Sequence, residues 1–183
     1  MTGDWRLSYN PSVENLRTLI RDVPDFPEPG IVFKDITPLL ADGEAFSAAI
    51  AAMSDAAAAL APSVIVGIES RGFIFGAPIA ARLGLGFVPV RKFGKLPWST
   101  HTQTYDLEYG TDTLEMHQDA VRTGDIVVVV DDVLATGGTA AATVDLVRGA
   151  GATVAAVSVL IELEFLAGRG RLDVPVQALI AYD

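Results

Sequence analysis

Two adjacent carboxylates, Asp131 and Asp132, stand at the end of the most apolar run in the chain. They follow four valines at 127–130 and precede a loop of small and hydroxyl residues, LATGGT at 134–139. Placing two like charges side by side is costly, so we expect a bound group that offsets the repulsion. Hydroxyl groups would donate hydrogen bonds to the carboxylates, and a nearby divalent cation would lower the cost further.

The loop after the acidic pair predicts a phosphate site. Its small residues leave backbone N–H groups unobstructed, Thr136 and Thr139 add hydroxyls, and a predicted helix N-terminus follows that favours an anion. Phosphate in the loop and hydroxyls on the carboxylates together fit a ribose 5-phosphate. A glycine pair after a strand can also be only a tight turn, and an aspartate there only a helix cap. A nucleotide-triphosphate loop would need a glycine spacing and a lysine that are absent.

Hydrophobic periodicity predicts the elements that must position these residues. Helices are expected at 11–23, 43–61, 73–84 and 137–151, and strands at 63–69, 86–93, 111–119, 125–131, 152–163 and 176–183. Continuous apolar strands that alternate with helices predict a parallel sheet covered on both faces, with ligands at the carboxyl ends of its strands. The strand at 111–119 alternates as antiparallel strands do. The polar stretch 94–110 predicts a lid or binding loop.

Composition narrows the classes of protein. The 183 residues suit one domain with a full core, with 50% hydrophobic and 20% charged residues. The net charge of -10 argues against a nucleic-acid partner, and the lack of cysteine excludes disulfides and cysteine nucleophiles. The apolar runs are too short to span a membrane, and the first residues have no apolar leader region. We therefore expect a soluble, cytoplasmic protein without a membrane partner.

Four blocks of sequence carry a resemblance to a known family. The string VVVVDDVLATGGT resembles the signature of the type I phosphoribosyltransferases, which bind phosphoribosyl pyrophosphate. The blocks DFPEPGIVFKDITPLL (25–40), GIESRGFIFG (67–76) and RKFGKLP…YDLEYG (91–110) resemble adenine phosphoribosyltransferases, in that order. The resemblance runs from about Val23 to the C-terminus.

The resemblance implies the type I phosphoribosyltransferase fold. This is an α/β fold with a central, mostly parallel sheet flanked by helices, a small hood and a flexible catalytic loop. In this chain the single domain would cover 1–183, with the hood and base-binding parts at about 24–40 and 157–183 and the flexible loop at about 94–115. A homodimer is typical of the family.

The resemblance also assigns residues to phosphoribosyl pyrophosphate. Asp131 and Asp132 would meet the ribose hydroxyls, and Arg71 would bind pyrophosphate beside Ser70, whose peptide bond to Glu69 would be strained or cis. Lys95 would add positive charge, from the same or the neighbouring subunit, with Arg91 as the other basic candidate. Mg²⁺ would be held mainly through the substrate, without a dedicated protein site. The 5-phosphate would lie on Ala135, Thr136, Gly137, Gly138 and Thr139.

A second set of residues would bind and activate adenine. Phe33 would stack on the base and Leu163 would press from the other side, while the backbone of Val32 and Lys34 would read the Watson–Crick edge. Taken alone, Phe33 is better explained as a core aromatic, and only its neighbours favour a role at the base. Glu108 would act as the acid/base on the purine ring, and Tyr109 would pack over the closed site. An isolated glutamate in a polar loop is otherwise usually a solvated side chain.

The implied reaction transfers the 5-phosphoribosyl group to adenine, giving AMP and pyrophosphate in purine salvage. Two alternatives stay open. A transferase for 6-oxopurines would use a lysine near 157–163, where none occurs. A non-catalytic regulator that senses phosphoribosyl pyrophosphate would carry a DNA-binding extension or a basic face. Lys34 departs from the arginine of many relatives, Trp98 and the run STHTQT also differ, and neither His101 nor residues 1–10 receive a role.

Overall fold

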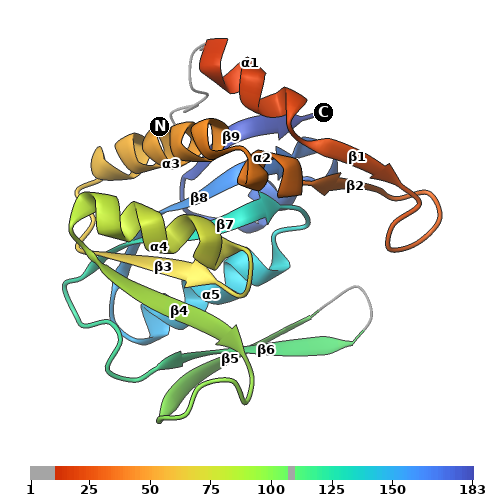
Figure 1. Cartoon of the computed structure of the whole chain (residues 1–183). Helices are drawn as coiled ribbons and strands as arrows, with labels where there is room; N and C mark the ends of the chain where they lie inside the picture. Colours follow the sequence, from red (N-terminus) through yellow and green to blue (C-terminus); the bar gives the residue numbers. More distant parts are fainter. Residues whose placement is uncertain (1–10, 107–109) are drawn as a thin grey trace.

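The structure, a computed structural model, describes residues 11–106 and 110–183, arranged around one large sheet (Figure 1). Its seven strands lie in the order β5-β6-β4-β3-β7-β8-β9. The five strands from β4 to β9 are parallel, and the hairpin of β5 and β6 joins antiparallel beside β4. The strands are β3 (Val64–Ile68), β4 (Gly86–Lys92), β5 (Thr100–Asp106), β6 (Thr111–His117), β7 (Ile126–Leu134), β8 (Thr153–Leu163) and β9 (Val176–Tyr182).

Helices cover both faces of this sheet. Figure 1 shows α1, α3 and α4 on one face and α5 on the other. A separate two-stranded sheet of β1 and β2 stands on the side to which the parallel strands point. The predicted α/β fold with a mostly parallel central sheet is therefore confirmed. The remaining elements are β1 (Arg21–Pro24), β2 (Val32–Asp35), α1 (Pro11–Thr18), α2 (Thr37–Ala41), α3 (Gly43–Ala58), α4 (Gly72–Leu83), α5 (Gly138–Gly149) and the short 3-10 helices η1 (Glu164–Leu166) and η2 (Gly168–Arg171).

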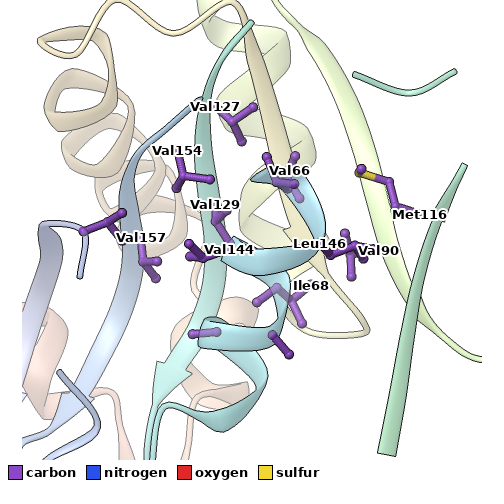
Figure 2. Packing of buried hydrophobic residues seen from close by; sticks show 14 of the residues in the cluster. Val66, Ile68, Val90, Met116, Val127, Val129, Val144, Leu146, Val154 and Val157 are labelled. Carbon is purple, nitrogen blue, oxygen red and sulfur yellow. The ribbon is translucent and has the colours of Figure 1, made fainter. Parts of the chain in front are cut away.

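The four valines of β7 explain why this run is the most apolar in the chain. All four are fully buried, because β7 is the middle strand of the parallel part and both of its faces are covered. Val127 and Val129 pack with residues of α5 (Figure 2), whereas Val128 and Val130 pack into the cluster under α3 and α4. Successive side chains of a strand point to opposite faces, so one strand supports both helical layers.

The helix predicted for 11–23 is shorter than expected. It ends at Thr18, and Arg21–Pro24 instead form β1, which pairs antiparallel with β2. Pro24 disfavours helical backbone at the residue before it, and Arg21 forms an ion pair with Asp35 across the two strands. Local periodicity was therefore overridden by strand pairing.

The prediction of a loop over 94–110 is also wrong in part. Thr100–Asp106 form β5, which pairs with β6 over seven positions. The strand escaped the pattern because its threonines alternate with His101, Gln103 and Tyr105 and not with a run of apolar residues, although threonine favours strands. Residues 107–109 lie outside the described residues, and with them Glu108 and Tyr109, so the roles expected for these two residues stay predictions.

Candidate active site

The acidic pair lies inside the end of β7, which continues to Leu134. Asp132 is 5% exposed, and its carboxylate accepts a hydrogen bond from the Arg71 Nε at 2.5 Å. Asp131 accepts from the backbone N–H of Asp132 at 2.8 Å and lines the pocket beside the following loop. The two carboxylates therefore face different partners, an arginine and a pocket.

Of the described carboxyl groups whose pKa is shifted, Asp131 is the one whose pKa is raised. Burial raises its pKa well above the usual value, and the neighbouring Asp132 charge raises it further. The Asp132 N–H and the Arg71 guanidinium oppose this shift but do not cancel it. Hydroxyl donors or a cation would favour the ionised form of Asp131, so the site is prepared for such a partner.

The loop after the pair encloses a pocket of about 90 Å³. Gly137 has a φ of 81°, a left-handed conformation that favours glycine, and it caps the N-terminus of α5. A Cβ at this position would lie 2.4 Å from the carbonyl oxygen of Gly168, so a side chain is sterically excluded as well. The pocket is lined by Asp131, Val133, Leu134, Ala135, Thr136, Gly137, Gly138, Thr139, Ala140 and Val159, which brings together all five residues predicted for the 5-phosphate.

A distant segment packs directly on this loop. A Cβ on Gly168 would lie 2.1 Å from the carbonyl oxygen of Ala135 and 2.9 Å from the Gly137 nitrogen. The next residue, Arg169, forms an ion pair with the buried Glu162 and donates to the Val176 carbonyl at 2.9 Å. Backbone contact with η2 therefore fixes the loop from its outer side. Sequence reasoning missed this segment, and its glycine-rich run AGRGR was the available signal.

Two further side chains reach the same loop and were not predicted. The Tyr105 hydroxyl lies 3.2 Å from the Thr139 hydroxyl, which joins β5 to the start of α5. A Cβ on Gly138 would lie 3.5 Å from the Arg171 Nη1 and 3.7 Å from the Tyr105 ring. Arg171 is exposed, and its side chain forms no ion pair with any residue in the described part of the chain. We call this region, with Asp131, residues 135–139, Gly168 and Arg171, the phosphate end.

Arg71 connects the phosphate end to the residues expected to hold the base. Its peptide neighbour is the cis bond between Glu69 and Ser70, as the resemblance implied. Besides its ion pair with Asp132, the Arg71 guanidinium carbon lies 5.4 Å from the Phe33 ring centroid. The predicted pyrophosphate residue therefore contacts both the ribose carboxylate and the predicted base-stacking ring.

The two other predicted cations differ in their partners. Arg91 donates to both carboxylate oxygens of Glu69 at 3.2 Å and to the Lys95 carbonyl, so its guanidinium is already engaged. Burial acts to raise the Glu69 pKa, but hydrogen bonds from Arg91 and the Lys92 N–H outweigh it, and the pKa is lowered. The Lys95 backbone is held by the buried Glu115, while its ammonium group forms no ion pair within residues 11–106 and 110–183. Lys95 is thus the freer cation of the two.

The residues predicted for adenine gather at β2 and the end of β8, which we call the base end. Phe33 meets Phe26 edge-on with ring centroids 5.2 Å apart. Val32 is 47% exposed and Phe26 is 52% exposed. The Lys34 ammonium pairs with Asp22 at 2.6 Å and lies over the Tyr182 ring, so only its backbone is available to a base. Leu163 ends β8 and packs at the margin of the core.

Comparison with known proteins places this site in a class. Residues 38–175 match the family model of the phosphoribosyl transferase domain. That stretch contains the acidic pair, the loop and η2, and it covers more than half of the chain. The fold and the site thus define a phosphoribosyltransferase.

Individual relatives narrow the class further. The chain is 57% identical to the adenine phosphoribosyltransferase of Streptomyces coelicolor, over 91% of this chain and 94% of that protein. It superposes with a TM-score of 0.90 on the crystal structure of the Thermoanaerobacter pseudethanolicus enzyme, at 51% identity over 93% and 99% of the two chains. The Saccharomyces cerevisiae enzyme, in complex with an imino-altritol bisphosphate and adenine, has a TM-score of 0.88 at 41% identity over 92% and 98%. The chain belongs to the adenine phosphoribosyltransferase family.

Proposed function

We propose that this protein transfers the 5-phosphoribosyl group from phosphoribosyl pyrophosphate to adenine, giving AMP and pyrophosphate in purine salvage. The observation that carries the proposal is the acidic pair at the end of β7, which adjoins a pocket lined by residues 135–139. The similarity of the chain to adenine phosphoribosyltransferases supports the same reaction. The adenine nitrogen N9 attacks the anomeric carbon of the ribose, the bond to pyrophosphate breaks, and the base loses a proton.

The phosphoribosyl group would lie along the end of β7. The free N–H groups at the start of α5, together with Thr136 and Thr139, suit the 5-phosphate. The ribose hydroxyls would donate to Asp131 and Asp132. For Asp131 this adds hydroxyl donors to the Asp132 N–H that its carboxylate already accepts, and such donors favour its ionised form.

Arg71 and Lys95 would stabilise the leaving pyrophosphate. Arg71 presents a forked donor that suits phosphate oxygens, and its present partner Asp132 would turn to the ribose hydroxyls. Lys95 lacks an ion pair among the described residues, so its charge is available to an incoming anion. Arg91 would act mainly by holding Glu69, and through it the Ser70 turn, in place. In an oxocarbenium-like transition state, positioning and charge stabilisation contribute most of the catalysis.

Adenine would enter between Phe33 and Leu163. One backbone C=O can accept from the 6-amino group, and one N–H can donate to N1, which suits the backbone of Val32 and Lys34. We propose that Glu108, which lies between β5 and β6 in the sequence, takes the proton from the purine ring and that Tyr109 covers the base.

The acidic pair also fits Mg²⁺, which prefers oxygen ligands. Within the described residues there is no cluster of three or more acidic or histidine side chains, so the substrate would supply most of the ligands. Asp131 and Asp132 would hold the ion indirectly, through the ribose hydroxyls. The ion supplies charge neutralisation of the pyrophosphate as it leaves.

We further propose that the protein works in the cytoplasm as a homodimer, as the resemblance implies. None of the helices in the described part of the chain is long and apolar enough to cross a membrane. Of the alternatives, a 6-oxopurine transferase is disfavoured because the β8 segment 157–163 has no lysine and its buried Glu162 is paired with Arg169. A phosphoribosyl-pyrophosphate-sensing regulator is disfavoured by the acidic balance of the chain.

The test is turnover with adenine and hypoxanthine at saturating phosphoribosyl pyrophosphate. The 6-oxo group cannot donate to a backbone carbonyl, and N1 of hypoxanthine is itself a donor. Leaving buried polar groups unpaired can cost roughly ten-thousand-fold in catalytic efficiency, and we expect discrimination of that order. Comparable catalytic efficiency on both bases would refute recognition of the base by the backbone of Val32 and Lys34. No turnover of either base would refute the proposed transferase activity.

A further inference from the structure

We propose that Arg171, on η2, binds the 5-phosphate and forms the charged wall of the phosphate pocket. The inference rests on the proposed function, because it concerns the phosphate of that substrate and of AMP. It assigns a binding residue that lies outside the signature loop, 32 residues beyond Thr139 in the sequence.

The position of Arg171 is the first observation. Its Nη1 lies 3.5 Å from the point where a Gly138 Cβ would be, at the N-terminus of α5. The Tyr105 ring and the Asp106 carbonyl approach the same point, at 3.7 and 3.8 Å. Because Gly138 has no side chain, the guanidinium and the helix N-terminus can face one anion together.

The second observation is that this guanidinium has no carboxylate partner among residues 11–106 and 110–183. In a chain with 23 acidic and 13 basic residues, most cations of the described part are ion-paired, among them Arg71 and Arg169. Arg171 is not, although it stands beside a pocket made of backbone N–H groups and hydroxyls. A forked guanidinium suits the oxygens of a phosphate group, and its charge would balance an anion that the loop alone meets only with neutral groups.

The third observation is that the backbone on both sides of Arg171 is fixed. Gly168 touches the Ala135 carbonyl of the loop itself, and Leu172 packs against the core. A cation carried on such a segment loses less freedom on binding than one on a free loop. The contact also places the segment and the phosphate loop in one rigid unit.

The experiment compares AMP with adenosine, which lacks the phosphate. Affinities for both are measured by calorimetry on the wild type, Arg171→Gln, Arg171→Lys and the control Arg122→Gln. Arg122 is exposed, forms no side-chain ion pair among the described residues, and precedes the opposite end of β7. We expect Arg171→Gln to lower the affinity for AMP about tenfold, as the loss of a charge-assisted hydrogen bond does, and to leave the affinity for adenosine unchanged. Arg171→Lys should fall between, and Arg122→Gln should match the wild type.

The outcomes separate the two proposals. An unchanged AMP affinity in Arg171→Gln, in a wild type that turns over adenine, would overturn the role of Arg171 and leave the transferase standing. An equal loss for AMP and adenosine would also overturn it, because the effect would not belong to the phosphate. Thermal melting checks the fold, and the exposed position predicts the same midpoint for Arg171→Gln as for the wild type. If Arg171→Gln melts at a lower temperature than the wild type, the test passes to Arg171→Lys. An AMP affinity of Arg171→Lys equal to that of the wild type would then count against the inference.

Discussion

Backbone packs against backbone at the phosphate end, whereas apolar side chains stand in solvent at the base end. Gly137 and Gly168 approach so closely that neither can carry a side chain without displacement. At the base end, Val32 and Phe26 are about half exposed, and Phe165, shortly after Leu163, is 60% exposed. The phosphate end is thus held by close backbone packing, while the base end has apolar surface that a planar base would cover.

The difference indicates where each end can be damaged. A closely packed backbone tolerates little added volume, so the phosphate end should respond to a single methyl group. The base end should instead respond to loss of a functional group that acts on the base. The predictions below test this division, in order of decreasing effect.

The largest effect is expected from Glu108→Gln. Glutamine preserves the size and can hydrogen-bond, but it cannot accept the ring proton, so turnover should fall by roughly a hundredfold or more. Adenine affinity should change much less, and the affinity for phosphoribosyl pyrophosphate should be unchanged. Single-turnover kinetics with both substrates measures the chemical step directly. A wild-type rate in the chemical step would show that Glu108 is a contact residue and not the acid/base.

A methyl group at the phosphate end is the next test. In Gly168→Ala the new Cβ would lie 2.1 Å from the Ala135 carbonyl oxygen, so η2 or the loop must move. We expect a loss of about 1–3 kcal/mol in the free energy of unfolding, as overpacking usually costs. The KM for phosphoribosyl pyrophosphate should rise about tenfold or more, with adenine binding nearly unchanged.

Gly170→Ala is the matched control for that variant. Gly170 lies in the same 3-10 helix, has no positive φ, and a Cβ there would meet nothing within 4 Å. Its stability and kinetics should therefore equal those of the wild type. Similar kinetics for the two alanine variants would contradict the view that contact with η2 shapes the phosphate loop.

These two ends also differ in how far the sequence could predict them. The loop 134–139 follows a buried strand and precedes a helix, so its chemistry could be recognised from one short stretch. Gly168, Arg171 and Tyr105 could not be assigned in this way, because the first two reach the loop from η2 and Tyr105 reaches it from β5. Contacts between distant segments leave no periodic trace in a single sequence.

Helices and strands could likewise be predicted where the pattern is local, and not where pairing with a distant segment decides the structure. Helices and strands with continuous apolar patterns, such as β7 and α5, were predicted to within a few residues. β5 was missed because its alternation is among polar residues, and β1 because pairing with β2 overrode a helical pattern. The family resemblance made Arg91 the other basic candidate for pyrophosphate, and only the fold reveals its hydrogen bonds to Glu69.

The acidic pair allows a test of how much Asp131 lowers the stability of the folded protein. The folded protein raises the Asp131 pKa, so the native state binds this proton more tightly than the unfolded chain does. The stability that this proton contributes is present in full below the unfolded pKa and is lost as the pH rises through the folded pKa. At pH 8, above the unfolded pKa, Asp131 therefore makes the folded state less stable than a neutral side chain would, and Asp131→Asn should melt higher.

The size and pH dependence of that gain can be measured together. A gain of roughly 1 kcal/mol would raise the melting temperature by about 2–4 °C in a domain of this size. The gain should shrink as the pH is lowered toward 3.8, the ordinary pKa of an aspartate, while affinity for phosphoribosyl pyrophosphate is lost at all pH values. A gain in stability that did not vary between pH 4 and pH 8 would mean that the Asp131 charge is not its source.

The smallest effect is expected where β5 contacts the phosphate end. Tyr105 lies on β5, one residue before Asp106 and the segment with Glu108, and its hydroxyl contacts Thr139 of the phosphate loop. Tyr105→Phe keeps the ring beside Gly138 and removes the hydroxyl, and with it the hydrogen bond to Thr139 and the interaction with Asp112 across the hairpin. A hydrogen bond of this kind is worth about 0.5–1.5 kcal/mol. The KM for phosphoribosyl pyrophosphate should rise by a factor of roughly two to ten. Thr104→Val removes the hydrogen bond to Thr113 in the same hairpin and should leave that KM unchanged. If Tyr105→Phe instead lowered the rate of the chemical step and left the KM alone, the hydroxyl would act on the placement of Glu108, and the two ends would have to be treated as one coupled site.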